Sequence, residues 1–249
     1  MGLCGHASQV ASCLSHSAGI EKPRNLEGRR VGIRTWQTTA ILWIRGILEE
    51  HYGVDLTTIQ WFRQDEEDIP FTLPPRFKLT QLSRDQNVNR MLVEGEVDAL
   101  IHAEIPSSFK QGDPRVRRLF VDAKAEEQRY YRATGIFPLM HTVVIKESLL
   151  ARSPWVATAL LKAFRESKEL AWRQMEDPRR VSLAWLRDLI EEQRELLGRD
   201  PWPYDLPANR TALETMIRYA HRHGMIRDAM SPESLFFPPS LETMPVGYV

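Results

Sequence analysis

The chain has 249 residues, of which 43% are hydrophobic, so it is long enough to bury a core in one large domain or two smaller ones. Lysine plus arginine and aspartate plus glutamate each number 33, and this balance excludes an overall field that would attract nucleic acid or an acidic membrane surface. No run of about 18 apolar residues occurs, so insertion into a membrane is not expected.

The amino-terminal segment, Met1 to Ser17, is rich in alanine, serine and glycine. It lacks the basic region and the continuous apolar stretch of a secretory signal, and we therefore expect a cytoplasmic protein. Cys4 and Cys13 lie in this segment without the spacing of a metal site, so they are not expected to carry chemistry.

The first half of the chain alternates apolar stretches of strand length with stretches of helical periodicity. Glycines at the ends of the helical stretches predict C-caps at Gly53 and Gly95. The acidic run at 65–68 is interpreted as a solvated loop, and the prolines that follow it indicate an irregular segment. The predicted elements are a strand at 29–34, a helix from Thr39, a strand at 55–62, a helix near 84–94 and a strand at 97–101.

The second half begins in the same way and then becomes mostly helical. The predicted elements are strands at 117–121 and 141–145 around a helix at 123–132, followed by helices at 154–175, 182–197 and 209–223. This alternation predicts the α/β class, with a mainly parallel sheet covered by helices on both faces. A functional site is then expected at the carboxyl ends of the strands.

The turn Thr35-Trp36-Gln37-Thr38-Thr39 joins the first predicted strand to the first helix. Free backbone N–H groups and the positive end of a helix dipole meet at such a turn, so Gln37, Thr38 and Thr39 are candidates to hold a ligand carboxylate. Trp36 is placed to stack on a ligand ring. The alternative is that one threonine only caps the helix and that Trp36 packs against a neighbouring loop.

Two arginines flank this turn. Arg34 and Arg45 could each pair with a substrate carboxylate through two parallel hydrogen bonds. Arg45 lies about two helical turns beyond the start of the helix, so it could face solvent instead.

Two histidines are candidate catalytic residues. His141 stands at the start of the predicted strand at 141–145, and His102 follows the strand that ends at 101. Either side chain can donate a proton near neutral pH, and a structural role at a strand end is the alternative for both. Glu104 could join them in a metal site, but the spacing is not diagnostic and no metal is predicted. His221 and His223 together are interpreted as a wet helix end.

Several segments, in the same order over residues 18 to 240, resemble the 4,5-dihydroxyphthalate decarboxylase family, a branch of the type II periplasmic-binding-protein superfamily. The segments that carry the resemblance are Leu26–Gly32, Thr35–Ala40, Arg45–Leu48, Tyr52–Val54, Gly95–Leu100, Tyr130–Arg132, Thr134–Pro138, Met140–Ile145 and Asp200–Tyr204.

This resemblance implies a periplasmic-binding-protein type II-like fold in which the first lobe is incomplete. Residues 1–21 would be a leader and first-lobe remnant, residues 22–137 the second lobe, and residues 138–249 a mostly helical return to the first lobe. Family members begin with further strands and helices, so the resemblance also implies that an amino-terminal part is missing.

The resemblance further implies non-oxidative loss of carbon dioxide from a dihydroxylated aromatic carboxylate. His141 would deliver the proton, with His102 as a second candidate, and the turn at Thr38 and Thr39 would hold the remaining carboxylate without any organic cofactor. Two alternatives stay open. One is a solute-binding protein, related to those of ABC transporters, that binds a small carboxylate without turning it over. The other is a non-catalytic relic that is stable only as a homo-oligomer.

Overall fold

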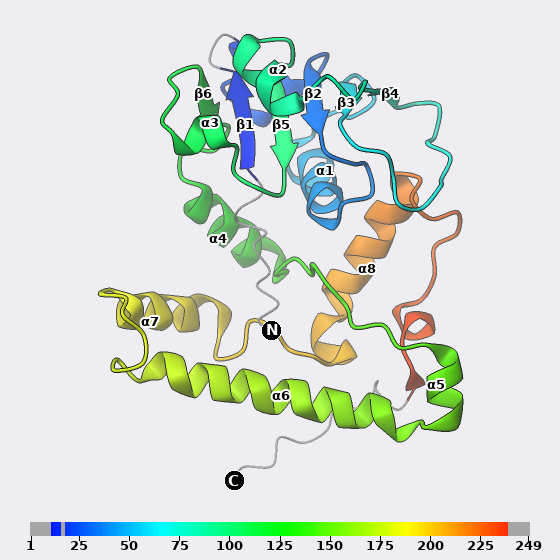
Figure 1. The fold of residues 1–249 in the computed structure, drawn as a ribbon, viewed down its shortest axis with the longest axis vertical. Coiled ribbons are helices and arrows are strands. Elements are labelled where there is room, and N and C mark those ends of the chain that lie inside the picture. The colour runs from blue at the N-terminus through cyan, green and yellow to red at the C-terminus, as the bar shows by residue number, and fades with distance from the viewer. Residues whose placement is uncertain (1–10, 16–17, 239–249) are drawn as a thin grey trace. The chain divides into compact units, whose positions relative to one another are not determined.

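The computed structural model describes residues 11–15 and 18–238. They form two compact units, coloured along the chain in Figure 1. The sheet unit contains the described residues up to Arg129 together with Met216–Ala229. The helical unit contains Tyr130–Thr215 and the described residues from Met230 onward. The domain limits implied by the family resemblance stay a prediction.

The sheet unit is built on one six-stranded sheet with the strand order β4-β3-β2-β5-β1-β6. Its neighbours β4, β3, β2 and β5 run parallel, while β1 is antiparallel to both β5 and β6. The strands are β1 (Ala11–Ser15), β2 (Arg30–Ile33), β3 (Gln60–Arg63), β4 (Lys78–Gln81), β5 (Ala99–His102) and β6 (Val116–Arg118). The predicted α/β class with a mainly parallel sheet is confirmed.

Helices and short turns connect these strands. Asn87 caps the start of α2, because its side chain accepts hydrogen bonds from two backbone N–H groups in the first turn. Gly53 and Gly95 end α1 and α2 in the left-handed conformation, at φ of 63° and 75°, as predicted. The elements are η3 (Pro23–Leu26), α1 (Thr39–Tyr52), α2 (Val88–Glu94), α3 (Ser107–Lys110) and α4 (Ala123–Thr134), which continues into the helical unit.

Alternating side chains of β5 show that both faces of the sheet are covered. Ala99 and Ile101 belong to a core cluster that includes α1, whereas Leu100 belongs to a second cluster that includes α2. Gly32 of β2 lies on the α2 side, where an added Cβ would come within 3.2 Å of Val88 Cγ1. The sheet and α2 therefore pack too closely at this point for a larger residue to fit without adjustment.

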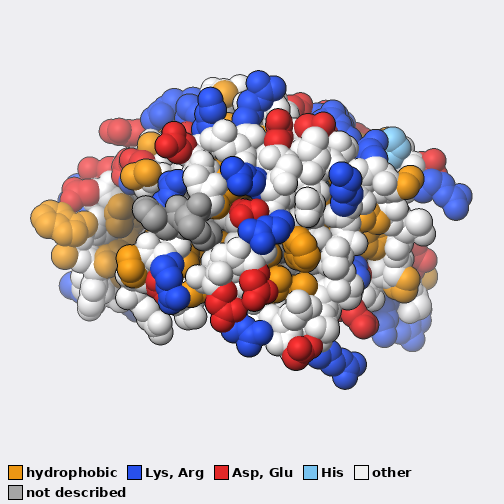
Figure 2. Space-filling model, turned by 90° about the horizontal axis from the view of Figure 1, so that it is seen from above, with side chains coloured by type: hydrophobic (Ala, Val, Ile, Leu, Met, Phe, Trp, Pro, Cys, Tyr) orange, Lys and Arg blue, Asp and Glu red, His pale blue; other side chains and the backbone are white. Residues whose placement is uncertain are grey.

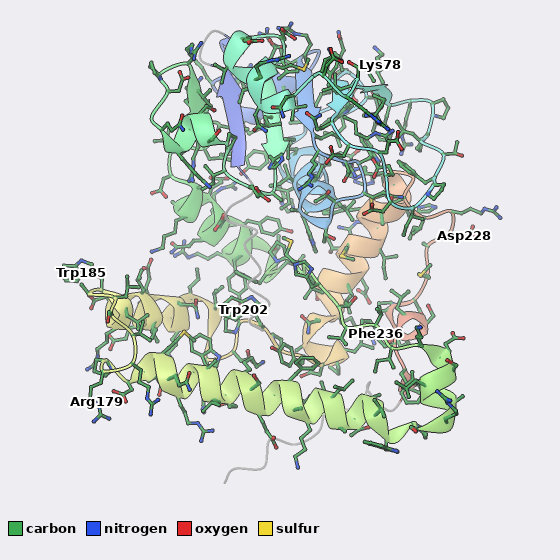
Figure 3. The ribbon with its side chains drawn as sticks, in the orientation of Figure 1. Lys78, Arg179, Trp185, Trp202, Asp228 and Phe236 are labelled. Carbon is green, nitrogen blue, oxygen red and sulfur yellow. The ribbon has the colours of Figure 1, made fainter. Side chains whose placement is uncertain are left out.

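The helical unit contains α5 (Glu147–Arg152), α6 (Trp155–Glu176), α7 (Leu186–Leu197), the first part of α8 (Leu206–Arg222) and η4 (Pro232–Leu235). Trp202, labelled in Figure 3, packs against Trp172 of α6 and Phe137, with ring centroids 6.2 and 5.7 Å away. Lys168 Nζ donates to the backbone oxygen of Trp202 at 2.7 Å. Aromatic contacts and this hydrogen bond hold the loop between α7 and α8 against α6.

The prediction of a strand at 141–145 is wrong. The structure has irregular backbone there, and Val143 and Val144 are 53% and 89% exposed. All strands in the described part of the chain belong to the sheet unit. An apolar stretch forms a strand only when a neighbouring strand accepts its hydrogen bonds, and the helical unit supplies none among its described residues.

None of the helices that the structure describes is long and apolar enough to cross a membrane. Figure 2 shows lysine and arginine side chains interspersed with aspartate and glutamate over the face seen from above. This distribution agrees with the balanced composition, so recognition of a charged ligand has to come from a local site.

Candidate functional site

The carboxyl ends of β2, β3 and β5 meet at one edge of the sheet. Ile33 pairs with Arg63 of β3 and with Ile101 of β5, and all three strands are parallel. Figure 1 shows the arrows of β2 and β5 pointing the same way. The residues that follow them leave the sheet together, because parallel strands end at the same edge. This edge brings together the turn after β2, the acidic run after β3 and His102 at the end of β5.

The turn Thr35–Thr39 leads from β2 into α1. The hydroxyls of Thr35 and Thr38 are hydrogen-bonded to each other at 2.5 Å, and the Thr38 carbonyl accepts from the N–H of Leu42 at 3.0 Å. The Thr38 side chain makes no capping hydrogen bond. Within the described part of the chain, the backbone N–H groups of Thr39 and Ala40 donate to no acceptor, so the start of α1 has two donors that a ligand can use.

The side chain of Glu67 accepts hydrogen bonds from two backbone N–H groups earlier in the turn, those of Trp36 and Gln37. Its carboxylate oxygens accept from the backbone of Trp36 at 2.6 Å and of Gln37 at 3.0 Å. Arg63 Nη1 donates to the same carboxylate at 3.0 Å, and the Glu67 side chain is only 5% exposed. The interpretation of the acidic run as a solvated loop is therefore wrong for Glu67, because the turn and Arg63 supply three donors that replace water.

The Trp36 side chain lies in the core. It has no exposed surface, and its ring Nε1–H donates to the backbone oxygen of His223 at 3.1 Å. Trp61 and Phe77 pack against it, with ring centroids 5.5 and 5.0 Å away. The ring therefore has no exposed face on which a ligand could stack. Trp36 packs within the protein, as in the alternative given for it from the sequence.

Arg45 of α1 is fully buried rather than solvent-facing. Its Cζ lies 3.6 Å from the centroid of the Trp36 ring, and its Nη2 lies 3.6 Å from the sulfur of Met225. Its Nε and Nη1 have no hydrogen-bond partner among the described residues. Burial lowers the pKa of the guanidinium to about 9, so it is still a cation at neutral pH. A buried cation without an ion pair is costly, and such groups are characteristic of sites that receive an anion.

Arg34 follows β2 directly and lies at the surface. Its Nε donates to Asp65 at 2.8 Å, and the two side chains are 55% and 46% exposed. An exposed pair of this kind contributes little free energy, so Arg34 can exchange Asp65 for another carboxylate at small cost.

His102 ends β5 and is half-buried at the same edge. Its Nδ1 lies 3.0 Å from the backbone nitrogen and 3.2 Å from the backbone oxygen of Glu104, so it can accept from the N–H or, when it carries a proton, donate to the carbonyl. Burial lowers the pKa of His102 below its ordinary value, with Glu104 opposing the shift. The ring is therefore mostly neutral at pH 7, and it lies at the same edge of the sheet as the turn.

His141 belongs to the helical unit, where it is exposed in an irregular segment. The structure therefore brings His102, but not His141, into the same unit as the turn. Among the described residues, no group of three or more His, Cys, Asp or Glu side chains is placed to hold a metal ion.

The interpretation of His223 as a wet helix end is wrong. Its side chain is fully buried, its Nε2 lies 3.2 Å from Glu49 Oε2, and its Nδ1 has no partner among the described residues. The spacing of Tyr219 and His223 could have placed both on one buried face of the helix predicted at 209–223, because residues four apart share one face. Nothing in the sequence distinguishes Glu67 from the acidic residues beside it.

No family model matches the sequence. A curated 4,5-dihydroxyphthalate decarboxylase of Comamonas testosteroni is 34% identical to the chain over 236 residues, which cover 92% of this chain and 72% of that protein. The chain belongs to the 4,5-dihydroxyphthalate decarboxylase family. A 4,5-dihydroxyphthalate decarboxylase of Pseudomonas putida is 32% identical over 126 residues, covering 48% of this chain and 49% of that one.

Solved structures show a more distant likeness to this member of the decarboxylase family. The periplasmic aliphatic sulphonate binding protein SsuA from Escherichia coli has a TM-score of 0.48 at 13% identity, covering 98% of this chain and 70% of its own. A putative SsuA from Methylobacillus flagellatus KT has a TM-score of 0.45 at 14% identity, covering 88% and 60%. Neither TM-score reaches 0.5, so the α/β fold class is established by the sheet itself.

Proposed function

We propose that the protein is a non-oxidative decarboxylase of 4,5-dihydroxyphthalate or a closely related dihydroxylated aromatic carboxylate. The observation that carries this proposal is 34% identity to a curated 4,5-dihydroxyphthalate decarboxylase over 92% of the chain. In this reaction the bond between the ring carbon and the carboxylate breaks, its electron pair stays on the ring carbon, and carbon dioxide leaves. The ring carbon then takes a proton. The protein must therefore hold an anion and deliver a proton.

The start of α1 supplies the anion site in this proposal. Free N–H groups of Thr39 and Ala40 lie at the positive end of the helix dipole, where a carboxylate is stabilised. The buried guanidinium of Arg45 adds a positive charge behind the turn, and Arg34 adds an exchangeable one at the surface. These groups would hold the carboxylate that stays on the ring.

His102 is the better supported of the two predicted acids. Its ring lies at the same sheet edge as the turn, and its lowered pKa makes the protonated ring, the minor form at pH 7, a stronger acid than an ordinary histidine. The proton that it delivers to the ring carbon is replaced from water after each turnover. His141 stays the second candidate.

Carbon dioxide release from 4,5-dihydroxyphthalate tests the activity and the acid together. Wild-type protein should release it, and His102→Asn should lower kcat by about 10²–10⁴-fold while leaving the affinity for the substrate within about threefold. His141→Asn is the matched control and should keep kcat. The reverse pattern would assign the acid to His141. Wild-type protein that binds the substrate without releasing carbon dioxide would contradict the decarboxylase proposal and leave a solute-binding role.

The cytoplasmic location and the homo-oligomer predicted from the sequence belong to the same proposal. Cell fractionation tests the location, and sedimentation at several protein concentrations tests the oligomer, because the population of an oligomer rises with concentration.

A further inference from the structure

The contacts of Glu67 are those of a bound carboxylate ligand. Both oxygens accept from successive backbone N–H groups, of Trp36 and Gln37, and Arg63 contributes a third, charged donor. Successive N–H groups with an arginine beside them form a donor set that recognises a free carboxylate equally well. We call these three donors the carboxylate niche.

A second observation points to an anion at this place. The guanidinium of Arg45 stacks on the ring of Trp36, and the backbone N–H of Trp36 is one of the donors of the niche. The Nε and Nη1 atoms of Arg45 have no partner among the described residues. Glu67 is the acidic group whose charge raises the pKa of Arg45 against the lowering effect of burial. Arg45 therefore lies within electrostatic reach of the niche but is not hydrogen-bonded to its present occupant.

The segment that carries Glu67 is loosely attached. Among the described backbone groups, those of residues 66–70 form no hydrogen bonds. Glu66, Asp68, Ile69 and Pro70 are all exposed, with Ile69 at 69%. The Glu67 side chain is therefore the tether that holds this stretch against the turn, and the stretch can move away without breaking backbone hydrogen bonds.

We propose that the carboxylate niche is a ligand subsite and that Glu67 is its internal occupant, which a carboxylate of the ligand displaces. The choice of ligand rests on the proposed function, whereas the exchange itself does not. An exchange of one carboxylate for another keeps the N–H groups of Trp36 and Gln37 and the guanidinium of Arg63 satisfied. Glu67 regains its hydration as it leaves.

Charge also favours exchange over binding beside Glu67. A ligand carboxylate at the N–H groups of Thr39 and Ala40 would lie close to a buried Glu67, and two carboxylates sharing one site repel each other. Displacement removes that repulsion and brings the ligand charge within reach of Arg45. The resident side chain therefore lowers the apparent affinity for every carboxylate ligand, because this affinity is proportional to the fraction of time that the niche is empty.

Calorimetry with phthalate, which lacks the hydroxyls of the substrate, tests the competition directly. Glu67→Gln removes the charged occupant at constant size and should bind phthalate at least about tenfold more tightly than wild type. The control Glu66→Gln removes a charge from the neighbouring exposed residue and should bind within about twofold of wild type. Near-ultraviolet circular dichroism establishes that both variants are folded.

A measurement on wild-type protein is independent of any variant. A glutamyl endopeptidase cuts after accessible glutamates, so phthalate should accelerate cleavage after Glu67, which mass spectrometry distinguishes from cleavage after Glu66. Tighter binding by Glu67→Gln with faster cleavage of wild type supports the exchange. Unchanged or weaker binding by that variant, cleavage that phthalate slows, or no phthalate binding to either protein would overturn it. These outcomes do not depend on carbon dioxide release, so the decarboxylase proposal can fail separately.

Discussion

Replacing Glu67 with glutamine keeps the size of the side chain and removes its charge. The N–H groups of Trp36 and Gln37 reach different oxygens of Glu67, and a glutamine in the same place keeps an oxygen at only one of these two positions. The other N–H then faces an NH₂ group in a position where the native side chain is 5% exposed. We therefore expect the substitution to destabilise the sheet unit.

The size of the loss follows from two contacts. A buried N–H group without an acceptor costs about 1–3 kcal/mol. Arg63 also loses its charged partner, but it is 18% exposed and keeps a hydrogen bond to Gln81 at 2.6 Å, so this contact adds at most about 1 kcal/mol. A total loss of roughly 1–4 kcal/mol corresponds to a decrease in Tm of roughly 2–16 °C for a chain of this length.

Tryptophan fluorescence can follow the unfolding of the sheet unit. Trp36, Trp43 and Trp61 are buried there, whereas Trp155 and Trp185 of the helical unit are 68% and 73% exposed and respond less to unfolding. Thermal scans should be made without carboxylate buffers, because a free carboxylate can fill the niche.

The matched control is Glu66→Gln, which makes the same chemical change one residue earlier on an exposed side chain. It should change the free energy of unfolding by less than about 0.5 kcal/mol. Equal Tm values for the Glu67 and Glu66 variants would show that the contacts of Glu67 with the turn do not exist in solution.

Three further substitutions test other parts of the sheet unit. Gly46→Ala places a Cβ against the Tyr219 ring, and thermal unfolding should show a loss of about 1–3 kcal/mol from overpacking despite the better helix propensity of alanine. Burial lowers the pKa of His223 while Glu49 opposes the shift, so stability is lost as the pH falls below about 6.5, and His223→Gln should remove a slope of up to about 1.4 kcal/mol per pH unit. Burial raises the pKa of Glu127 to about 7, so its contribution is lost as the pH rises through that value. Denaturant titrations should therefore show Glu127→Gln gaining roughly 1–2 kcal/mol over wild type between about pH 5 and pH 8, after allowance for partial exposure.

Local sequence patterns predicted most of the sheet unit, because its central strands are apolar and its helices α1 and α2 end at glycines. The apolar stretches that became β2 and β5 are buried on both faces, and glycines in the left-handed conformation end α1 and α2 where predicted. Two strands were not predicted. The edge strand β4 is mostly exposed and therefore lacks an apolar pattern, and β1 lies in a segment of small residues interpreted as a leader.

The candidate site was predicted in position but not in detail. The rule that sites lie at strand ends placed His102 and the turn at one edge, which the structure shows. The partner of the turn could not be predicted, because Glu67 reaches it across 30 residues of sequence from Gln37 and only the folded chain brings them together. The same applies to Arg45 and His223, whose burial depends on contacts between α1 and the end of α8.

One continuous helix, α8, begins in the helical unit and ends in the sheet unit, with the boundary between Thr215 and Met216. Its last turns supply Tyr219, whose ring packs against Trp43. His223, directly after the helix, accepts a hydrogen bond from Trp36 Nε1 through its backbone oxygen. During synthesis the sheet is therefore complete in sequence by Arg129, but its core stays open until roughly 100 more residues are made, about 5–20 s later. In that interval the face of α1 that carries Trp43 is uncovered, so a chaperone can bind to it and nascent chains can aggregate through it.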